Sequence, residues 1–229
     1  RYSNPAVDAS PSAQLFSWET PVPINPFFDG IPWVICSSFL HNFTPSELST
    51  LPIDTTNAAG LNANDKIALL LKILQEKFAS DDVKKGSKEW RSVLGSISFL
   101  QQKLGLVKEA GESIRTLIAA EQNGPGIALK QALGHQLINE GMYVEAEELM
   151  RPACIEVDGP DRAWKYSPQS VGFRRTLLEA IWKQGVGKRE DAEDLVEEIK
   201  ELIEGMRGGE MEVYVDDERE TLEKLLGEL

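Results

Sequence analysis

The sequence predicts an all-α protein, a solenoid of antiparallel helix hairpins preceded by an extended N-terminal arm. Three observations lead to this fold class. After residue 62, apolar residues recur at helical spacing in one segment after another. Short loops that contain glycine or proline separate these segments, so successive helices should be antiparallel neighbours. Before residue 62 the pattern differs, because this stretch holds eight of the twelve prolines of the 229-residue chain.

The arm, residues 1–62, is expected to be extended and to pack along the helical body. Proline fixes its own φ and disfavours a helix at the preceding residue, so the X-Pro steps hold this segment extended or turning. The arm also carries seven of the chain's thirteen Phe and Trp residues, a content that disordered segments lack. One short helix is expected in it, because Thr44-Pro45-Ser46-Glu47 matches a capping box with proline at the first helical position.

The helical body, residues 63–229, should contain eight helices. Residues 65–78 place Ile67, Leu70, Leu71 and Leu74 on one helix face. Residues 87–104 begin at Ser87, a good N-cap residue. The other expected helices span residues 107–122, 127–140, 143–154, 168–184, 190–206 and 216–229. Only residues 212–215 alternate as a strand does, and they are too few to build a sheet.

Composition and charge exclude some classes of partner. Apolar residues make up 41% of the chain and charged residues 27%, which is ordinary for a globular protein. The net charge of −13 opposes both a nucleic acid held by phosphate contacts and docking on an anionic membrane. Residues 188–229 hold 16 Asp and Glu but only 6 Lys and Arg. This acidic surplus is either a solvated helix surface or a face for a basic partner.

Cysteines and histidines form no recognisable catalytic or metal-binding pattern. Cys36 and Cys154 are far apart and no CxxC occurs, which favours two buried thiols in a reducing compartment and hence a cytoplasmic protein. The two histidines, His41 and His135, lack the spacing of a zinc site. Cys154 and His135 are the one Cys-His pair within a hairpin, and a structural thiol is the favoured interpretation. We therefore expect no metal, no cofactor and no catalytic residues.

The most informative stretch is residues 132–149. It contains the letters LGHQL at residues 133–137, GMY at residues 141–143, and Ala146 in the next helix. This resembles a tetratricopeptide repeat, whose first helix carries L-G-x-x-L, followed by a Gly-x-Tyr turn and a small Ala. The resemblance implies that Gly134 lets the second helix approach closely, and that Ala146 fills the same crossing from the other side.

Two weaker copies flank this unit. The turn and its alanine recur 36 residues earlier, at Gly105 and Ala110, and 44 residues later, from Gly185 to Ala192 with two extra turn residues. Both periods exceed the family's length of about 34 residues, so Sel1-type or other α-solenoid hairpins remain an alternative. The resemblance covers residues 87–206, about half the chain, and residues 65–78 and 216–229 would then cap the terminal units.

In a tetratricopeptide stack the first helix of each hairpin lines the concave surface, so the resemblance implies three tracks of groove residues. Counting back from the glycine turns places these tracks at Phe99 and Lys103, at Gln131, His135 and Asn139, and at Arg175, Glu179, Trp182 and Lys183. Residues four apart share one helix face. The tracks suit either a groove that meets a partner or the solvent face of amphipathic helices.

The sequence therefore predicts a non-catalytic protein-interaction scaffold that binds an extended peptide or a partner protein in this groove. Family members that grip C-terminal carboxylates use Lys, Asn and Arg at such positions, whereas Glu179 would repel an anion here. The aromatic arm is a second possible occupant of the groove. The alternative is a small-molecule-binding protein, or a lyase- or isomerase-like enzyme, with a pocket between arm and helices near Trp33, Phe99, His135 and Trp182. A closed pocket would favour that alternative, and an open groove the scaffold.

Overall fold

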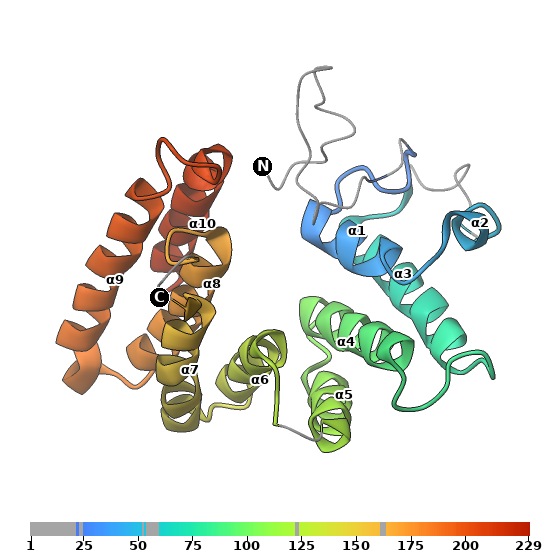
Figure 1. Cartoon of the computed structure of the whole chain (residues 1–229), viewed down its shortest axis with the longest axis horizontal. Coiled ribbons are helices and arrows are strands. Elements are labelled where there is room, and N and C mark those ends of the chain that lie inside the picture. The colour runs from blue at the N-terminus through green and yellow to red at the C-terminus, as the bar shows by residue number, and fades with distance from the viewer. Residues whose placement is uncertain (1–21, 23–24, 52, 54–59, 122–123, 161–163) are drawn as a thin grey trace. The chain divides into compact units, whose positions relative to one another are not determined.

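The computed structural model describes residues 22, 25–51, 53, 60–121, 124–160 and 164–229 (Figure 1). Throughout these residues the regular structure is helical, with ten α-helices and no strand. The chain divides into two compact units, residues 1–120 and residues 121–229. The predicted boundary between residues 62 and 63 lies inside the first unit.

The first unit is built on a run of helices in which each packs against the next. Its helices are α1 (Trp33–Leu40), α2 (Pro45–Leu48), α3 (Ala63–Phe78), α4 (Lys88–Lys103) and α5 (Val107–Ala120). Helix α3 packs on α4, α4 packs on α5, and α1 contacts both α3 and α4. Ser87 caps α4 as expected, because its hydroxyl accepts a hydrogen bond of 3.0 Å from the N–H of Trp90.

Aromatic residues of the predicted arm belong to the core of the first unit. Phe27 and Phe39 are fully buried, in one apolar cluster with Leu70 and Leu74 of α3 and Leu100 of α4. Phe27 and Phe39 therefore pack on α3 and α4. The prolines and aromatic rings of residues 1–21 lie outside the described part of the chain.

The expectation of an extended arm is wrong for residues 33–40, which form α1. This helix starts directly after Pro32. A proline is tolerated there, because the first N–H groups of a helix have no partner within the helix and the ring fixes a suitable φ. The proline signals a helix start in this context and not a break.

The short helix α2 has the predicted capping box. The N–H of Glu47 donates to the Thr44 hydroxyl at 3.3 Å, and the N–H of Thr44 donates to the Glu47 carboxylate at 2.6 Å. The Lys77 ammonium of α3 donates to the same carboxylate at 2.6 Å and lies 4.9 Å from the centre of the Phe43 ring. Hydrogen bonds from Lys77 and Thr44 lower the pKa of Glu47 to about 2.

The second unit contains two helix hairpins and a final helix. Its helices are α6 (Ile127–Asn139), α7 (Tyr143–Val157), α8 (Pro168–Trp182), α9 (Arg189–Glu204) and α10 (Val215–Glu228). Each of α6 to α9 packs against the next; α6 also contacts α8, and α10 packs on both α8 and α9 (Figure 1). The strand-like alternation at residues 212–215 is misleading, since Glu212–Tyr214 form a 3-10 turn that leads into α10.

All eight helices expected in the body are present.

The turns of the hairpins α4–α5 and α6–α7 share one geometry. Gly105 and Gly141 have φ values of +71° and +79°, a region in which glycine carries no steric penalty. In each turn the residue after the glycine closes the helix with a hydrogen bond of the Schellman type. The Leu106 N–H donates to the Gln101 carbonyl at 2.9 Å, and the Met142 N–H donates to the Leu137 carbonyl at 2.8 Å. Ala110 and Ala146 are both fully buried in the helix that follows. The repeat of 36 residues in the sequence is therefore also a repeat in the structure.

The close approach expected at Gly134 is present, with a different partner. A Cβ built on Gly134 would lie 2.5 Å from Sδ of Met150 on α7 and 3.4 Å from a methyl of Thr176 on α8. The side chain nearest to Gly134 on α7 is Met150, and Ala146, one turn away, belongs to a buried cluster with Ile138 and Ala180. Glycine at residue 134 thus allows α6 to approach two helices at once.

Replacing Gly134 with leucine should destabilise the second unit by about 1–3 kcal/mol, because Sδ of the buried Met150 side chain occupies the space that the new side chain needs. The free energy of unfolding, from chemical denaturation followed by circular dichroism, measures the effect. Gly95→Leu is the matched control, since Gly95 is also inside a helix but has no atom within 4 Å of a built Cβ. Equal stability of the two variants would contradict the packing described here.

Candidate functional site

Two of the predicted tracks lie side by side in the second unit, one on α6 and one on α8. They meet at Gly172 of α8, where a built Cβ would lie 3.3 Å from Nε2 of Gln131 and 3.8 Å from a guanidinium nitrogen of Arg175. The Gln131 amide and the Arg175 guanidinium therefore flank the same short stretch of α8. The contact between α6 and α8 brings these side chains together.

His135 connects the two helices one turn further along α6. Its Nε2 lies 3.1 Å from the hydroxyl of Thr176, and that hydroxyl donates to the Gly172 carbonyl at 3.1 Å. A threonine hydroxyl has a single proton to donate, so in this arrangement it accepts its hydrogen bond from the His135 ring. His135 thus holds α6 against α8 and does not project as a separate binding group.

Two of the predicted residues on α8 are engaged by the last helices of the chain. Arg175 forms an ion pair with Glu218 of α10, whose side chain is fully buried. The indole N–H of Trp182 donates to the Leu229 carbonyl at 2.9 Å, and the Arg189 guanidinium lies 4.1 Å from the centre of the Trp182 ring. Arg175 and Trp182 therefore anchor the C-terminal helices.

The remaining predicted residues of the second unit form what we call the first-helix surface: Gln131, Asn139, Glu179 and Lys183. Asn139 is exposed at the end of α6, and Glu179 and Lys183 make an ion pair of 2.6 Å one turn apart on α8. Phe99 and Lys103 belong to the first unit. There the Lys103 ammonium lies 5.3 Å from the centre of the Phe99 ring, which packs on the core of that unit.

The residues suggested for a pocket lined by aromatic rings are divided between the two units. Trp33 and Phe99 pack against the core of the first unit. His135 and Trp182 lie in the second unit. There His135 is hydrogen-bonded to the Thr176 hydroxyl, and Trp182 is hydrogen-bonded to the Leu229 carbonyl. Each of these rings thus has a local packing or hydrogen-bonding role.

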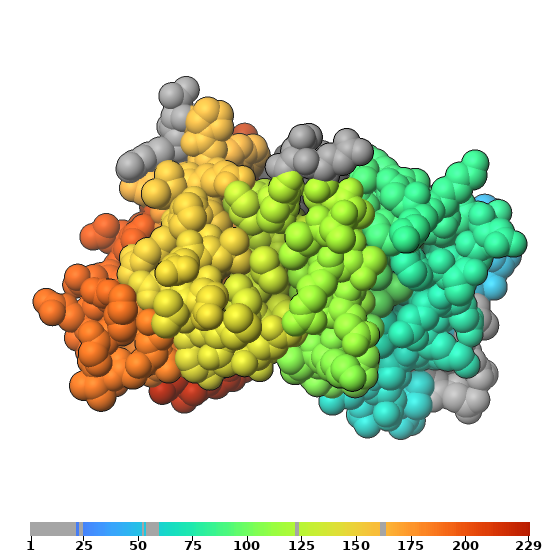
Figure 2. Space-filling model, turned by 90° about the horizontal axis from the view of Figure 1, so that it is seen from below, coloured from blue at the N-terminus to red at the C-terminus, as the bar shows by residue number. Residues whose placement is uncertain are grey.

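A groove that sequence reasoning missed lies between α7 and α9, with α8 as its floor; we call it the α7–α9 groove. Its volume is about 700 Å³. Leu177 and Ile181 of α8 line it together with Ile155 of α7 and Leu195 of α9. In Figure 2 the surfaces of α7, in yellow, and α9, in orange, adjoin. Leu177 and Ile181 lie on a different face of α8 from Glu179 and Lys183, because residues two apart on a helix are 200° apart.

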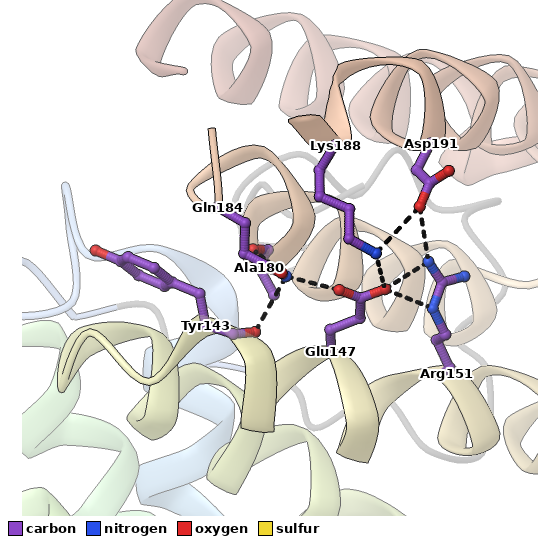
Figure 3. A network of polar contacts seen from close by, with 7 residues as sticks. All are labelled: Tyr143, Glu147, Arg151, Ala180, Gln184, Lys188 and Asp191. Atoms are coloured by element: carbon purple, nitrogen blue, oxygen red, sulfur yellow. Dashed lines mark hydrogen bonds and ion pairs between the residues drawn. The ribbon is translucent and has the colours of Figure 1, made fainter. Parts of the chain in front are cut away.

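A buried carboxylate, Glu147, connects the elements on one side of this groove (Figure 3). It receives hydrogen bonds of 2.7 Å from the Gln184 amide, 2.8 Å from the Arg151 guanidinium and 3.2 Å from the Lys188 ammonium. Burial opposes ionisation of Glu147, but these three donors outweigh it and hold its pKa below the ordinary value. Arg151 and Lys188 both also reach Asp191, at 3.5 Å and 3.3 Å.

A second buried network, around Arg174, joins α7, α8 and α9. Two nitrogens of its guanidinium each lie 3.1 Å from an oxygen of Asp158, and its Nε donates to Glu198 at 2.6 Å. The Ser170 hydroxyl donates to Asp158 at 2.6 Å. Burial opposes the charge on Asp158, yet Arg174 and Ser170 hold its pKa below the ordinary value. The detectable sequence signal for both networks is a charged residue inside the apolar stripe of a helix.

Both cysteines are free and buried, as predicted. Burial raises the pKa of Cys36 and of Cys154 to about 12, so neither thiol is a nucleophile at neutral pH. Among the described residues, no group of three or more His, Cys, Asp or Glu side chains is placed to hold a metal ion. No helix in the described part of the chain is both long and apolar enough to cross a bilayer.

No family model matches this sequence, and neither a curated protein nor a solved structure matches it. The tetratricopeptide resemblance therefore depends on the residue pattern and on the geometry of the hairpins alone.

Glu147→Gln should destabilise the second unit by about 1–3 kcal/mol at neutral pH, because the buried donors around it lose a charged acceptor. Since the folded pKa of Glu147 is lowered, its stabilisation is complete above the usual value of 4.5 and is lost as pH falls through the lowered value. The difference between wild type and variant should therefore shrink in acid.

Chemical denaturation at neutral and acidic pH measures this difference. Glu148→Gln is the matched control, because Glu148 is the exposed neighbour of Glu147 on α7. A loss for Glu147→Gln that stays constant with pH, or an equal loss for Glu148→Gln, would contradict the role of the carboxylate.

Proposed function

We propose that the chain is a non-catalytic interaction scaffold whose second unit binds an extended peptide on the first-helix surface. The observation that carries this proposal is the meeting of the α6 and α8 tracks at Gly172. The Gln131 amide and the Arg175 guanidinium lie over Gly172, so polar groups of both helices converge at this point of the surface. The tetratricopeptide resemblance supports the same surface, since first helices line the groove in that family.

The side chains of this surface suit a peptide backbone. The side-chain amides of Gln131 and Asn139 each supply two N–H donors and a carbonyl acceptor. These groups can form hydrogen bonds with the backbone C=O and N–H groups of an extended peptide. Glu179 and Lys183 pair with each other and add no net charge. Arg175, the strongest candidate for holding a terminal carboxylate, is paired with Glu218. An internal segment of a partner therefore suits the surface better than a C-terminal tail.

A random peptide library displayed on phage and selected on the immobilised full chain tests this proposal. Enriched peptides should bind with a dissociation constant that rises about 2- to 10-fold in Gln131→Ala and in Asn139→Ala, the loss expected for one hydrogen bond. Fluorescence anisotropy with the synthetic peptides measures it.

Gln75→Ala provides the matched control, because Gln75 is an exposed amide on α3 of the first unit. The proposal fails if no peptide is enriched, or if the enriched peptides bind the Gln131 and Asn139 variants as tightly as the wild type.

A further inference from the structure

We infer a second interaction surface, the α7–α9 groove, which receives a short amphipathic helix with Lys or Arg flanking its apolar stripe. Its walls are α7 and α9, the second helices of the two hairpins, and its floor is α8. It is separate from the first-helix surface and does not depend on the function proposed above.

The groove has the length and the apolar floor that a helix requires. Arg174, Leu177 and Ile181 occupy positions i, i+3 and i+7 of α8, and Asp191, Asp194 and Glu198 have the same spacing on α9. Seven residues of helix span about 10 Å, so the α8 floor and the α9 wall each run for about two helical turns. An amphipathic partner helix presents its anchors at this same spacing.

Ile155 supplies an apolar contact that the chain itself leaves uncovered. This side chain lines the groove on α7 and is 75% exposed, whereas Leu195 on the opposite wall is 7% exposed. Burying an exposed isoleucine under an apolar partner is favourable, since burial of apolar surface drives most protein associations. A polar small molecule would leave that contact unused.

The charge of the groove selects a basic partner. Its two cations are already engaged, because Arg151 pairs with Glu147 and Asp191, and Arg174 pairs with Asp158 and Glu198. Glu198 nevertheless keeps 47% of its side chain exposed.

Asp194 lines the same wall, and in the described part of the chain it makes no hydrogen bond or ion pair. Asp194 and the exposed part of Glu198 therefore have capacity for cations from outside. Lys or Arg placed beside the apolar stripe of a partner helix would complement them and exclude acidic partners.

Three labelled peptides of equal length test this inference: an amphipathic Leu/Lys helix, a scrambled peptide of the same composition, and a Leu/Glu helix with the same apolar stripe. Fluorescence anisotropy with the full chain measures their dissociation constants. The Leu/Lys helix should bind about tenfold more tightly than the scrambled peptide, a difference of about 1.4 kcal/mol. The Leu/Glu helix should not bind.

Variants of the groove locate the binding. Asp194→Lys and Ile155→Glu should each weaken the Leu/Lys helix about tenfold, since each removes one of the two complementary features. The matched controls are Glu223→Lys on α10, and Val213→Glu at another exposed apolar residue; both should bind as the wild type does. Asn139→Ala should also leave binding unchanged, which separates this groove from the first-helix surface.

Several outcomes would overturn the inference. Equal binding of the scrambled peptide, or equal weakening by Glu223→Lys, would mean that only the general acidity of the chain attracts the probe. Binding of the Leu/Glu helix would contradict the charge argument. Unchanged binding in Asp194→Lys and Ile155→Glu would place the peptide elsewhere.

Discussion

The absence of a side chain at Gly134 is the constraint on which the second unit depends. Sδ of Met150 and the Thr176 methyl occupy the space that a larger residue would need, so α6 lies close to both α7 and α8. Because α6 contacts α8 directly, His135 reaches Thr176 and Gln131 reaches Gly172. The adjacency of the two tracks follows from this one close approach.

Buried charge gives the hairpins a defined register on the opposite side of α8. Glu147 and Arg174 each have several hydrogen-bonding partners drawn from neighbouring helices. Desolvation makes such groups costly, so they contribute little net stability and are strongly destabilising when one partner is removed. Their geometric demands fix how α7, α8 and α9 are positioned. The α7–α9 groove takes its shape from that arrangement. Asp191 belongs to the Glu147 network and Glu198 to the Arg174 network, and both residues also line the groove.

Helix positions could be predicted from the sequence because apolar periodicity and glycine turns are local signals. The capping box at Thr44 and the turn at Gly141 formed as expected for the same reason. Helix α1 was missed, since Pro32 was counted as a breaker when it stands at a helix start. The partner of Gly134 was also misjudged, because which residue of α7 faces it depends on how the helices cross.

Site geometry was harder to predict than helix position. Counting back from the glycine turns placed Gln131 and Arg175 on two first helices, but it gave no indication that Glu218 and the Leu229 carbonyl would engage Arg175 and Trp182. Those contacts join residues more than forty positions apart, a separation that helical periodicity does not describe. The α7–α9 groove escaped prediction for a similar reason, since its lining comes from three helices.

Nuclear Overhauser effects at Gly134 test the central claim most directly. If α6 lies against α7 and α8 as described, the α-protons of Gly134 should show strong effects to the side chain of Met150 and to the methyl group of Thr176. Effects to both partners would establish the close approach that brings the two tracks together. Strong effects to Met150 with none to Thr176 would separate α6 from α8 and contradict the first-helix surface. Absence of both would contradict the packing of the hairpins themselves.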